Sequence, residues 1–229
     1  MYERSYYYLP MPDVSSFSAM ATTSDGRLLR GEQTRRAILQ RAADIASVEG
    51  LEGLSIGRLA AELGASKSGV FAHFGSKEEL QLATVEAARE RFVEAVVVPA
   101  LKAPRGLRRL SALCDGWLAY AREPVFAGGC FFCAVDAEFN ARPGRVRDAL
   151  AVARRDWIGL FVTTIEGAQG LGEIDPGVDA RQLTFELDAF LLAANTDALL
   201  YDDPVAYERA STAMRARLRS AASDPALVG

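Results

Sequence analysis

The chain has 229 residues, half of them hydrophobic and about a quarter charged, with a formal net charge of −4. This length can bury a substantial core in one large or two small domains, and no apolar run approaches the ~18 to 20 residues that a membrane span needs. The first residues lack the apolar stretch of a secretory signal, and three cysteines without an export signal favour a reducing compartment. We therefore expect a cytoplasmic protein with no membrane partner.

The positive charge is concentrated near the N-terminus, although the whole chain is acidic. Residues 27–77 hold eight Lys or Arg against five acidic residues, whereas residues 78–229 hold 17 against 22. Such an asymmetry is typical of a protein in which one small module meets nucleic-acid phosphates and the remainder does not.

The first segment of the chain shows no periodic pattern. Residues 1–26 are rich in Tyr, Ser, Pro and Met, and we predict a flexible arm over residues 1–30. An overextended translation start is the alternative, since Met11 and Met20 are later candidates. Helical periodicity begins at Gln33.

Three short helices are predicted next. The first ends at Gly50, the second lies between a Ser55 cap and Gly64, and the third lies between a Ser66 cap and Gly75. Apolar residues at three- and four-residue spacings mark the inward face of each helix. The predicted inward residues are Ala37, Ile38, Ala42, Ile45 and Ala46 in the first helix, Ile56, Leu59, Ala60 and Leu63 in the second, and Val70, Phe71 and Phe74 in the third.

A longer helical region follows. Ser76 and Glu79 form a capping box, which predicts a helix that runs to Val98 and is stopped by Pro99. No stretch alternates with the period of two that strands require, so we predict an all-α fold. Further helices are predicted at about 107–122, 130–140, 144–169, 179–201 and 204–221.

Residues 55–74 have the spacing of a helix-turn-helix. Ala60 is small where the second helix crosses, Gly64 permits the turn, and Val70 packs the next helix down. The stretch from Thr34 to Leu80, including the GSKEEL that opens the long helix, resembles the N-terminal domain of TetR/AcrR-family regulators. This resemblance implies a DNA-binding domain over residues 31–78.

The same resemblance implies a larger helical ligand-binding and dimerisation domain over residues 79–229. The protein would be a homodimer that binds a double-stranded operator with an inverted repeat. We predict a transcriptional regulator, a repressor that a small, mostly apolar effector releases from DNA. Leu183, Leu187, Phe190, Leu191 and Ala194 form the stripe that we assign to the dimer interface.

Candidate DNA contacts follow from the helix-turn-helix. The exposed face of the third helix should enter the major groove, and its neighbours should reach phosphates. Relatives often carry Tyr where Phe71 stands, a larger residue at Ala72 and a polar one at Gly57, so base contacts should be few. The predicted DNA-binding residues are Arg35, Arg36, Ser55, Ser66, Lys67, Ser68, Gly69, Ala72, His73 and Lys77.

The second domain carries most of the large aromatic side chains, and a pocket for an apolar effector needs such walls. We predict that Phe92, Trp117, Tyr120, Phe126 and Phe161 line it.

Cys130 and Cys133 leave two interpretations open. A zinc site lacks ligands, because only Cys114 and His73 remain to complete it, and we predict no metal or cofactor. The pair either packs as small apolar residues or forms a thiol-based redox sensor or redox protein. A single histidine and the lack of hydrolase or nucleotide-binding motifs indicate that the protein is not an enzyme, and we predict no catalytic residues.

Overall fold

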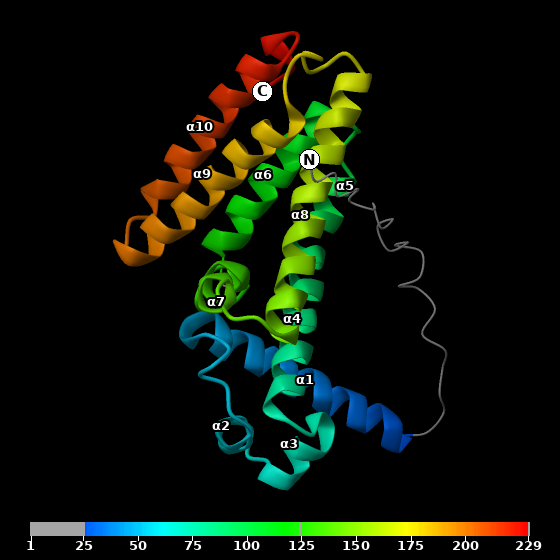
Figure 1. Ribbon diagram of the computed structural model, residues 1–229, viewed down its shortest axis with the longest axis vertical. Coiled ribbons are helices and arrows are strands. Elements are labelled where there is room, and N and C mark those ends of the chain that lie inside the picture. The colour runs from blue at the N-terminus through cyan, green and yellow to red at the C-terminus, as the bar shows by residue number, and fades with distance from the viewer. Residues whose placement is uncertain (1–25, 124, 229) are drawn as a thin grey trace.

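The computed structural model describes residues 26–123 and 125–228, and within them the chain is helical with no strand (Figure 1). This confirms the predicted all-α fold. No helix in the described ranges is both long and apolar enough to cross a membrane. The elements are α1 (Gly26–Glu49), α2 (Ile56–Glu62), α3 (Lys67–Phe74), α4 (Lys77–Phe92), π-helix η2 (Val93–Val97), α5 (Val98–Leu101), α6 (Leu107–Arg122), α7 (Phe131–Phe139), α8 (Arg145–Gly170), α9 (Ala180–Leu200), α10 (Val205–Ala221) and 3₁₀-helix η3 (Pro225–Leu227).

The starts of the short helices follow the predicted caps. The hydroxyls of Ser55, Ser66 and Ser76 each accept a hydrogen bond from a backbone N–H three residues later, at 3.1, 3.0 and 3.1 Å. Gly64 has a φ of 61°, which a side chain would disfavour, and it closes α2. The Glu79 carboxylate does not reach back to Ser76 as a capping box predicts; it pairs with Arg145 at 2.5 Å.

Two helix boundaries differ from the prediction. Helix α1 begins at Gly26, seven residues before Gln33, so residues 26–30 belong to a helix and not to the predicted arm. Residues 1–25 lie outside the described part of the chain. The helical path also continues past Pro99 to Leu101. Proline is tolerated there because it lies in the first turn of α5, directly after the wider π-helical turn.

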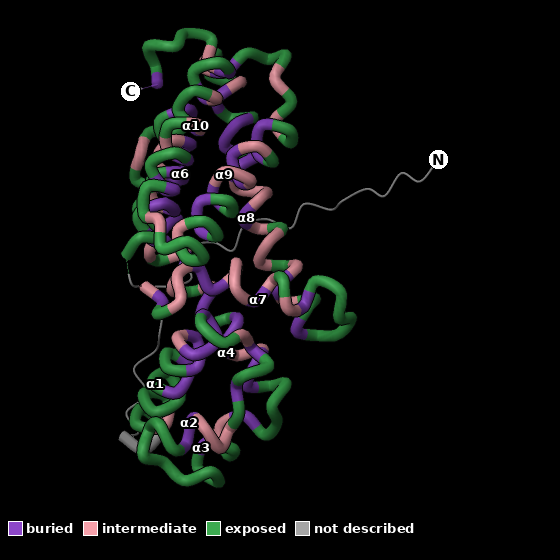
Figure 2. The backbone as a smooth tube through the Cα atoms, turned by 90° about the vertical axis from the view of Figure 1, so that its left-hand side faces the viewer, coloured by how far each residue is buried: buried purple, intermediate pink, exposed green. Residues whose placement is uncertain are grey.

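Helix α4 joins the two parts of the molecule (Figure 1). Its beginning packs with α1 and α3, and α4 also packs against α8 of the second domain. Its continuation through η2 and α5 packs against α6. Helices α9 and α10 form an antiparallel pair that lies on α6. Buried residues run through the centre of both parts, as the view in Figure 2 shows.

The apolar stripe that we assigned to the dimer interface faces inward instead. Leu183, Leu187, Leu191 and Ala194 are fully buried within the same chain, and Phe190 is partly buried against that core. Helix α9 exposes a different row of apolar side chains, because α6 and α10 cover the face that carries Leu183, Leu187 and Leu191. The exposed members are Phe185, Leu192 and Leu199, with 69%, 37% and 53% of their surface accessible.

Candidate nucleic-acid interface

Helix α3 lies at one end of the molecule and presents most of its surface to solvent (Figure 1). Val70 and Phe74, one turn apart, are buried and fix the helix on its neighbours. Phe71 was predicted to point inward but is 51% exposed, because it follows Val70 by about 100° around the helix. The exposed face also holds the predicted contacts Lys67, Ser68, Gly69 and Ala72, with His73 partly exposed at its edge.

Lys67 lies across Gly57 of α2. A Cβ atom placed on Gly57 would lie 3.1 Å from Lys67 Cε, so the glycine leaves room for the lysine stem. Lys67 forms no ion pair with any residue that the structure describes. Its ammonium group is therefore available to an anion outside the chain. Gly57, where relatives often carry a polar residue, leaves the space that the Lys67 side chain occupies.

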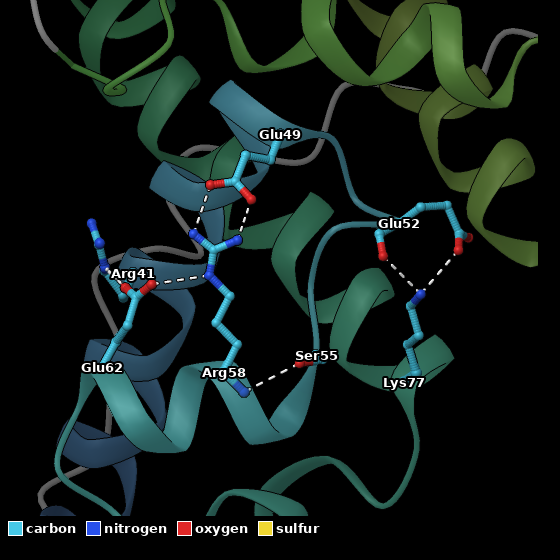
Figure 3. Close-up of polar contacts among 7 residues, drawn as sticks. All are labelled: Arg41, Glu49, Glu52, Ser55, Arg58, Glu62 and Lys77. Carbon is cyan, nitrogen blue, oxygen red and sulfur yellow. Dashed lines mark hydrogen bonds and ion pairs between the residues drawn. The ribbon is translucent and has the colours of Figure 1, made fainter.

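Lys77 is engaged within the protein (Figure 3). Its Nζ donates to the backbone oxygen and to the carboxylate of Glu52, both at 2.9 Å. The hydrogen bond from Lys77 lowers the pKa of the Glu52 carboxyl. Both side chains are about half exposed, so Lys77 can exchange this partner for a phosphate.

Arg58 joins α2 to α1 through carboxylates (Figure 3). Its guanidinium pairs with both oxygens of Glu49 and, at 3.0 Å, with Glu62, which also pairs with Arg41 at 2.5 Å. The hydrogen bonds from Arg58 lower the pKa of Glu49 and of Glu62. Arg58 therefore fixes the helix-turn-helix. Only its i,i+4 pairing with Glu62 is visible in the sequence.

The remaining predicted DNA contacts have different settings. Arg35 and Arg36 are exposed on α1, and the Arg35 guanidinium lies 5.2 Å from the centre of the Phe74 ring. The hydroxyls of Ser55 and Ser66 accept from backbone amides, so they act as helix caps in this structure. All four residues lie in the N-terminal domain, which also contains α3.

Helix α7 of the second domain is attached directly to α1. The Glu138 carboxylate accepts hydrogen bonds from the backbone N–H groups of Leu51 and Glu52, at 2.8 and 2.9 Å. The backbone N–H of Gly128 donates to Ser47 Oγ at 2.9 Å, and a Cβ on Gly128 would lie 2.2 Å from the Ser47 carbonyl oxygen. These contacts connect α7 and the segment before it to the end of α1 and the turn that follows.

Arg91 of α4 makes further contacts between α1 and the segment that precedes α7. Its guanidinium pairs with Asp44 of α1 at 2.9 Å and donates to the backbone oxygen of Val125. It also lies 4.1 Å from the centre of the Phe126 ring. One cation thus connects α1, α4 and the segment that leads into α7.

The five aromatic residues predicted to line an effector pocket lie in one buried cluster. Phe92 contacts Tyr120 and Trp157 at ring-centre distances of 5.2 and 5.1 Å, and Trp157 contacts Phe161 at 4.6 Å. Trp117 and Phe126 each contact Tyr120, at 6.4 and 6.0 Å. The rings fill the space between them, so an effector among them requires the cluster to open.

Two surface pockets are lined by other residues. One, of about 430 Å³, lies between α6, α10 and η3 and includes Arg108, Ser111 and Arg215. The other, of about 230 Å³, lies between α7 and α8 and includes Asp136, Phe139 and Arg154. The second pocket lies on the helix that contacts α1.

Cys130 and Cys133 occupy the N-cap and the third position of α7, and both thiols are free. A hydrogen bond from the Cys133 thiol lowers the pKa of Cys130, and the same bond raises the pKa of Cys133. Cys130 is buried and Cys133 partly buried. The described residues contain no group of three or more His, Cys, Asp or Glu side chains arranged to hold a metal ion.

The described geometry defines a class of protein: a helix-turn-helix domain joined by a long helix to a helical second domain, as in bacterial transcription regulators. The family model for bacterial regulatory proteins of the tetR family matches residues 38–84, and the model for the tetracyclin repressor-like C-terminal domain matches residues 106–214. The chain belongs to the TetR family of DNA-binding transcriptional regulators.

Solved structures agree with this assignment. A TetR transcriptional regulator from Chloroflexus aurantiacus has 26% identity and a TM-score of 0.79, with 85% of this chain and 98% of that chain covered. A TetR-family regulator from Cytophaga hutchinsonii has 17% identity, a TM-score of 0.77 and the same coverage. AibR, solved with isovaleryl coenzyme A and operator DNA, has 22% identity, a TM-score of 0.61 and coverage of 78% and 94%. Comparison with curated protein sequences gives no significant match.

Proposed function

We propose that the protein is a homodimeric repressor that binds an inverted-repeat operator through α3 and releases it when a small molecule binds the second domain. The exposed face of α3 carries this proposal: Lys67 has no anionic partner among the described residues, and small side chains at Ser68 and Ala72 allow close approach to base edges. Arg35, Arg36 and Lys77 supply phosphate contacts around that face. No catalytic role is proposed.

The proposed dimer uses the exposed row of α9. Phe185, Leu192 and Leu199 are seven residues apart, so they lie along one side of the helix. Large exposed apolar residues in such a row are typical of a protein interface. A two-fold pair of subunits must place its two α3 helices about 34–36 Å apart to read successive major grooves.

The proposed effector acts through α7. Glu138 of α7 binds the turn after α1, and Gly128, just before α7, binds Ser47 of α1, so a ligand that shifts α7 would change the position of the DNA-binding domain. A ligand that prefers the DNA-free arrangement by about 1.4 kcal/mol weakens operator binding tenfold. The relative AibR, solved with both an acyl-coenzyme A and DNA, supports a regulator of this kind.

The first test is selection of bound DNA from a random pool by the full-length protein. We expect an enriched inverted repeat whose half-sites are about one helical turn apart. Selected sequences without two-fold symmetry would contradict the proposal. Operator affinity is then measured with and without candidate effectors, and effector affinity with and without operator. Linkage requires the two ratios to be equal, so a tightly bound ligand that leaves operator affinity unchanged is not the effector.

Oxidation of the cysteine pair is the alternative signal. The hydrogen bond from Cys133 lowers the pKa of Cys130, and this favours oxidation, since the thiolate is the reactive form. A double Cys130→Ser, Cys133→Ser variant separates the two signals. We expect it to keep both operator binding and the response to the small molecule. A regulator that senses only oxidants loses its response in this variant.

A further inference from the structure

The pocket between α7 and α8 combines apolar walls with an acidic group. Phe139, Leu150 and Ala151 supply the walls, and the carboxylate of Asp136 and the guanidinium groups of Arg147 and Arg154 line it as well. Its volume of about 230 Å³ suits a molecule of only a few heavy atoms. A ligand bound here touches the same helix that Glu138 joins to the DNA-binding domain.

Asp136 has no partner of its own. Among the described residues, none donates a hydrogen bond to its carboxylate and none forms an ion pair with it. The neighbouring Arg154 attracts it only through space, because both terminal nitrogens of that guanidinium bind the carboxylate of Asp188. The indole N–H of Trp157 also points to Asp188, at 3.3 Å.

Both arginine side chains of the pocket pair with carboxylates other than Asp136. Arg147 lies at the exposed side and pairs with Asp148 at 3.5 Å. Each guanidinium group of the pocket therefore has a carboxylate partner outside its lining, Asp148 for Arg147 and Asp188 for Arg154, whereas Asp136 has none in the part of the chain that the structure describes. A half-buried carboxylate without a counterion is costly, and a ligand that supplies the positive charge removes that cost.

An aromatic ring stands beside this carboxylate. Phe139 is almost fully buried, lines the pocket and lies one turn after Asp136 on α7. The ring already attracts one cation, since the guanidinium carbon of Arg142 lies 5.7 Å from its centre. An aromatic face next to a carboxylate is the combination that favours alkylammonium groups.

We infer that the pocket between α7 and α8 binds a small organic cation, an amine or quaternary ammonium with a short apolar tail, with Asp136 as its counterion and Phe139 as its aromatic wall. This inference rests on the proposed function, because it names the chemical class of the effector. The apolar tail lies against Leu150 and Ala151, and the charged head lies between Asp136 and Phe139.

Acid should weaken the binding. Burial raises the pKa of the Asp136 carboxyl to about 6, and the groups that face it are Arg147 and Arg154 from α8, Asp188 from α9 and Cys133 from α7. A cation requires the ionised carboxylate, which is lost as the pH falls through that pKa. Between pH 7 and pH 5 the affinity should fall about tenfold.

The test is calorimetric titration of the full-length protein with three probes of similar apolar size. They are butylammonium, butan-1-ol and butanoate, which are cationic, neutral and anionic. We expect the cation to bind most tightly, and Asp136→Asn to weaken it at least tenfold, while the control variant Glu166→Gln, at an exposed carboxylate of α8 outside the pocket, leaves it unchanged. Tighter binding of butanoate, or equal binding of the cation to the wild type and Asp136→Asn, would overturn the inference.

Operator titration in the presence of the cation then separates this inference from the proposed function. Binding that depends on Asp136 but leaves operator affinity unchanged supports the cation site and counts against its role as an effector site. An absence of cation binding, together with release of the operator by another small molecule, rejects the cation site and leaves the proposed regulation intact.

Discussion

The carboxylate of Glu138 accepts a hydrogen bond from the backbone N–H of Leu51 at 2.8 Å, and this contact joins the two domains 87 positions apart in the sequence. A second bond, from the N–H of Glu52, makes the contact bidentate. Gly50 completes the arrangement, since a Cβ there would lie 2.6 Å from the same carboxylate. The Glu138 carboxylate therefore satisfies two N–H groups of the turn after α1, and the glycine at position 50 leaves room for it.

Replacing that carboxylate should loosen the joint. Glu138→Gln keeps the shape but removes the charge and one acceptor, leaving a backbone N–H without its partner. We expect a loss of about 1–2 kcal/mol in the free energy of unfolding, or a fall of roughly 2–8 °C in melting temperature. The control is Glu166→Gln, on the exposed side of α8, which should change neither. Equal melting temperatures for Glu138→Gln and wild type would contradict the role of this contact.

Lys77 and Glu52 should have opposite effects on DNA binding. Lys77→Ala removes a phosphate contact, so binding should weaken for all DNA sequences and the salt slope should fall by about 0.9. Glu52→Gln removes the intramolecular partner of Lys77, and operator affinity should rise. Affinity is measured by fluorescence anisotropy at several salt concentrations. Lys102→Ala, an exposed lysine of the second domain, is the control for total charge.

A hydroxyl on Phe71 should improve operator binding. The ring is exposed on the surface that we propose faces DNA, and relatives often carry tyrosine there, so Phe71→Tyr adds a donor for a phosphate oxygen. We expect affinity to increase about three- to tenfold, as for one additional hydrogen bond, with no change in the salt slope. Phe74→Tyr adds the same atom to a buried ring of α3 and should give no gain. A gain from Phe74→Tyr alone would place the interface elsewhere.

The exposed row of α9 should control association. Introducing charge through Phe185→Glu and Leu192→Glu should convert the proposed dimer to a monomer and weaken operator binding by more than tenfold, since each half-site then binds one subunit alone. Sedimentation velocity measures the first effect, and anisotropy the second. Leu171→Glu, at an equally exposed site at the end of α8, should leave the dimer intact. If the α9 variant remains dimeric, the dimer interface lies on another face of the protein.

The pKa of Asp136 predicts how folding stability changes with pH. The folded-state pKa of about 6 lies above the ordinary value of 3.8, so the folded state binds this proton more tightly. The ionised carboxylate thus destabilises the fold above pH 6, and this effect disappears as the pH falls toward 4. We expect Asp136→Asn to raise the melting temperature at pH 7 and to match wild type near pH 4. A pH-independent difference would refute this explanation.

The elements of the fold were predictable because local signals specify them. Serine caps, glycine stops and apolar spacing gave α2, α3 and α6 to α10 with boundaries within about two residues. The start of α1 at Gly26 was missed because residues 26–32 show no apolar period. The path through Pro99 was missed because a π-helical turn has no sequence signal comparable to a cap.

The directions of side chains were harder to predict, since they depend on which face a neighbouring helix covers. The periodic row on α9 was found, but the choice between the Leu183 and Phe185 sides depends on where α6 and α10 pack. Likewise the pairing of Arg58 with Glu49, nine positions earlier on a different helix, depends on how α1 and α2 pack. Contacts between distant segments, such as Glu138 with Leu51, leave no periodic pattern in the sequence.

The π-helical segment from Val93 to Val97 changes the direction in which the side chains beyond it point around the helix axis. An α-helix turns by about 100° per residue, so one additional residue in a single turn rotates everything beyond it by that amount. The side of α4 that packs on α1 and the side of α5 that packs on α6 therefore do not form one continuous stripe along the helix. A one-residue deletion here would restore a uniform α-helix and rotate one domain against the other. Relatives that lack this residue should hold their DNA-binding domains at a different angle.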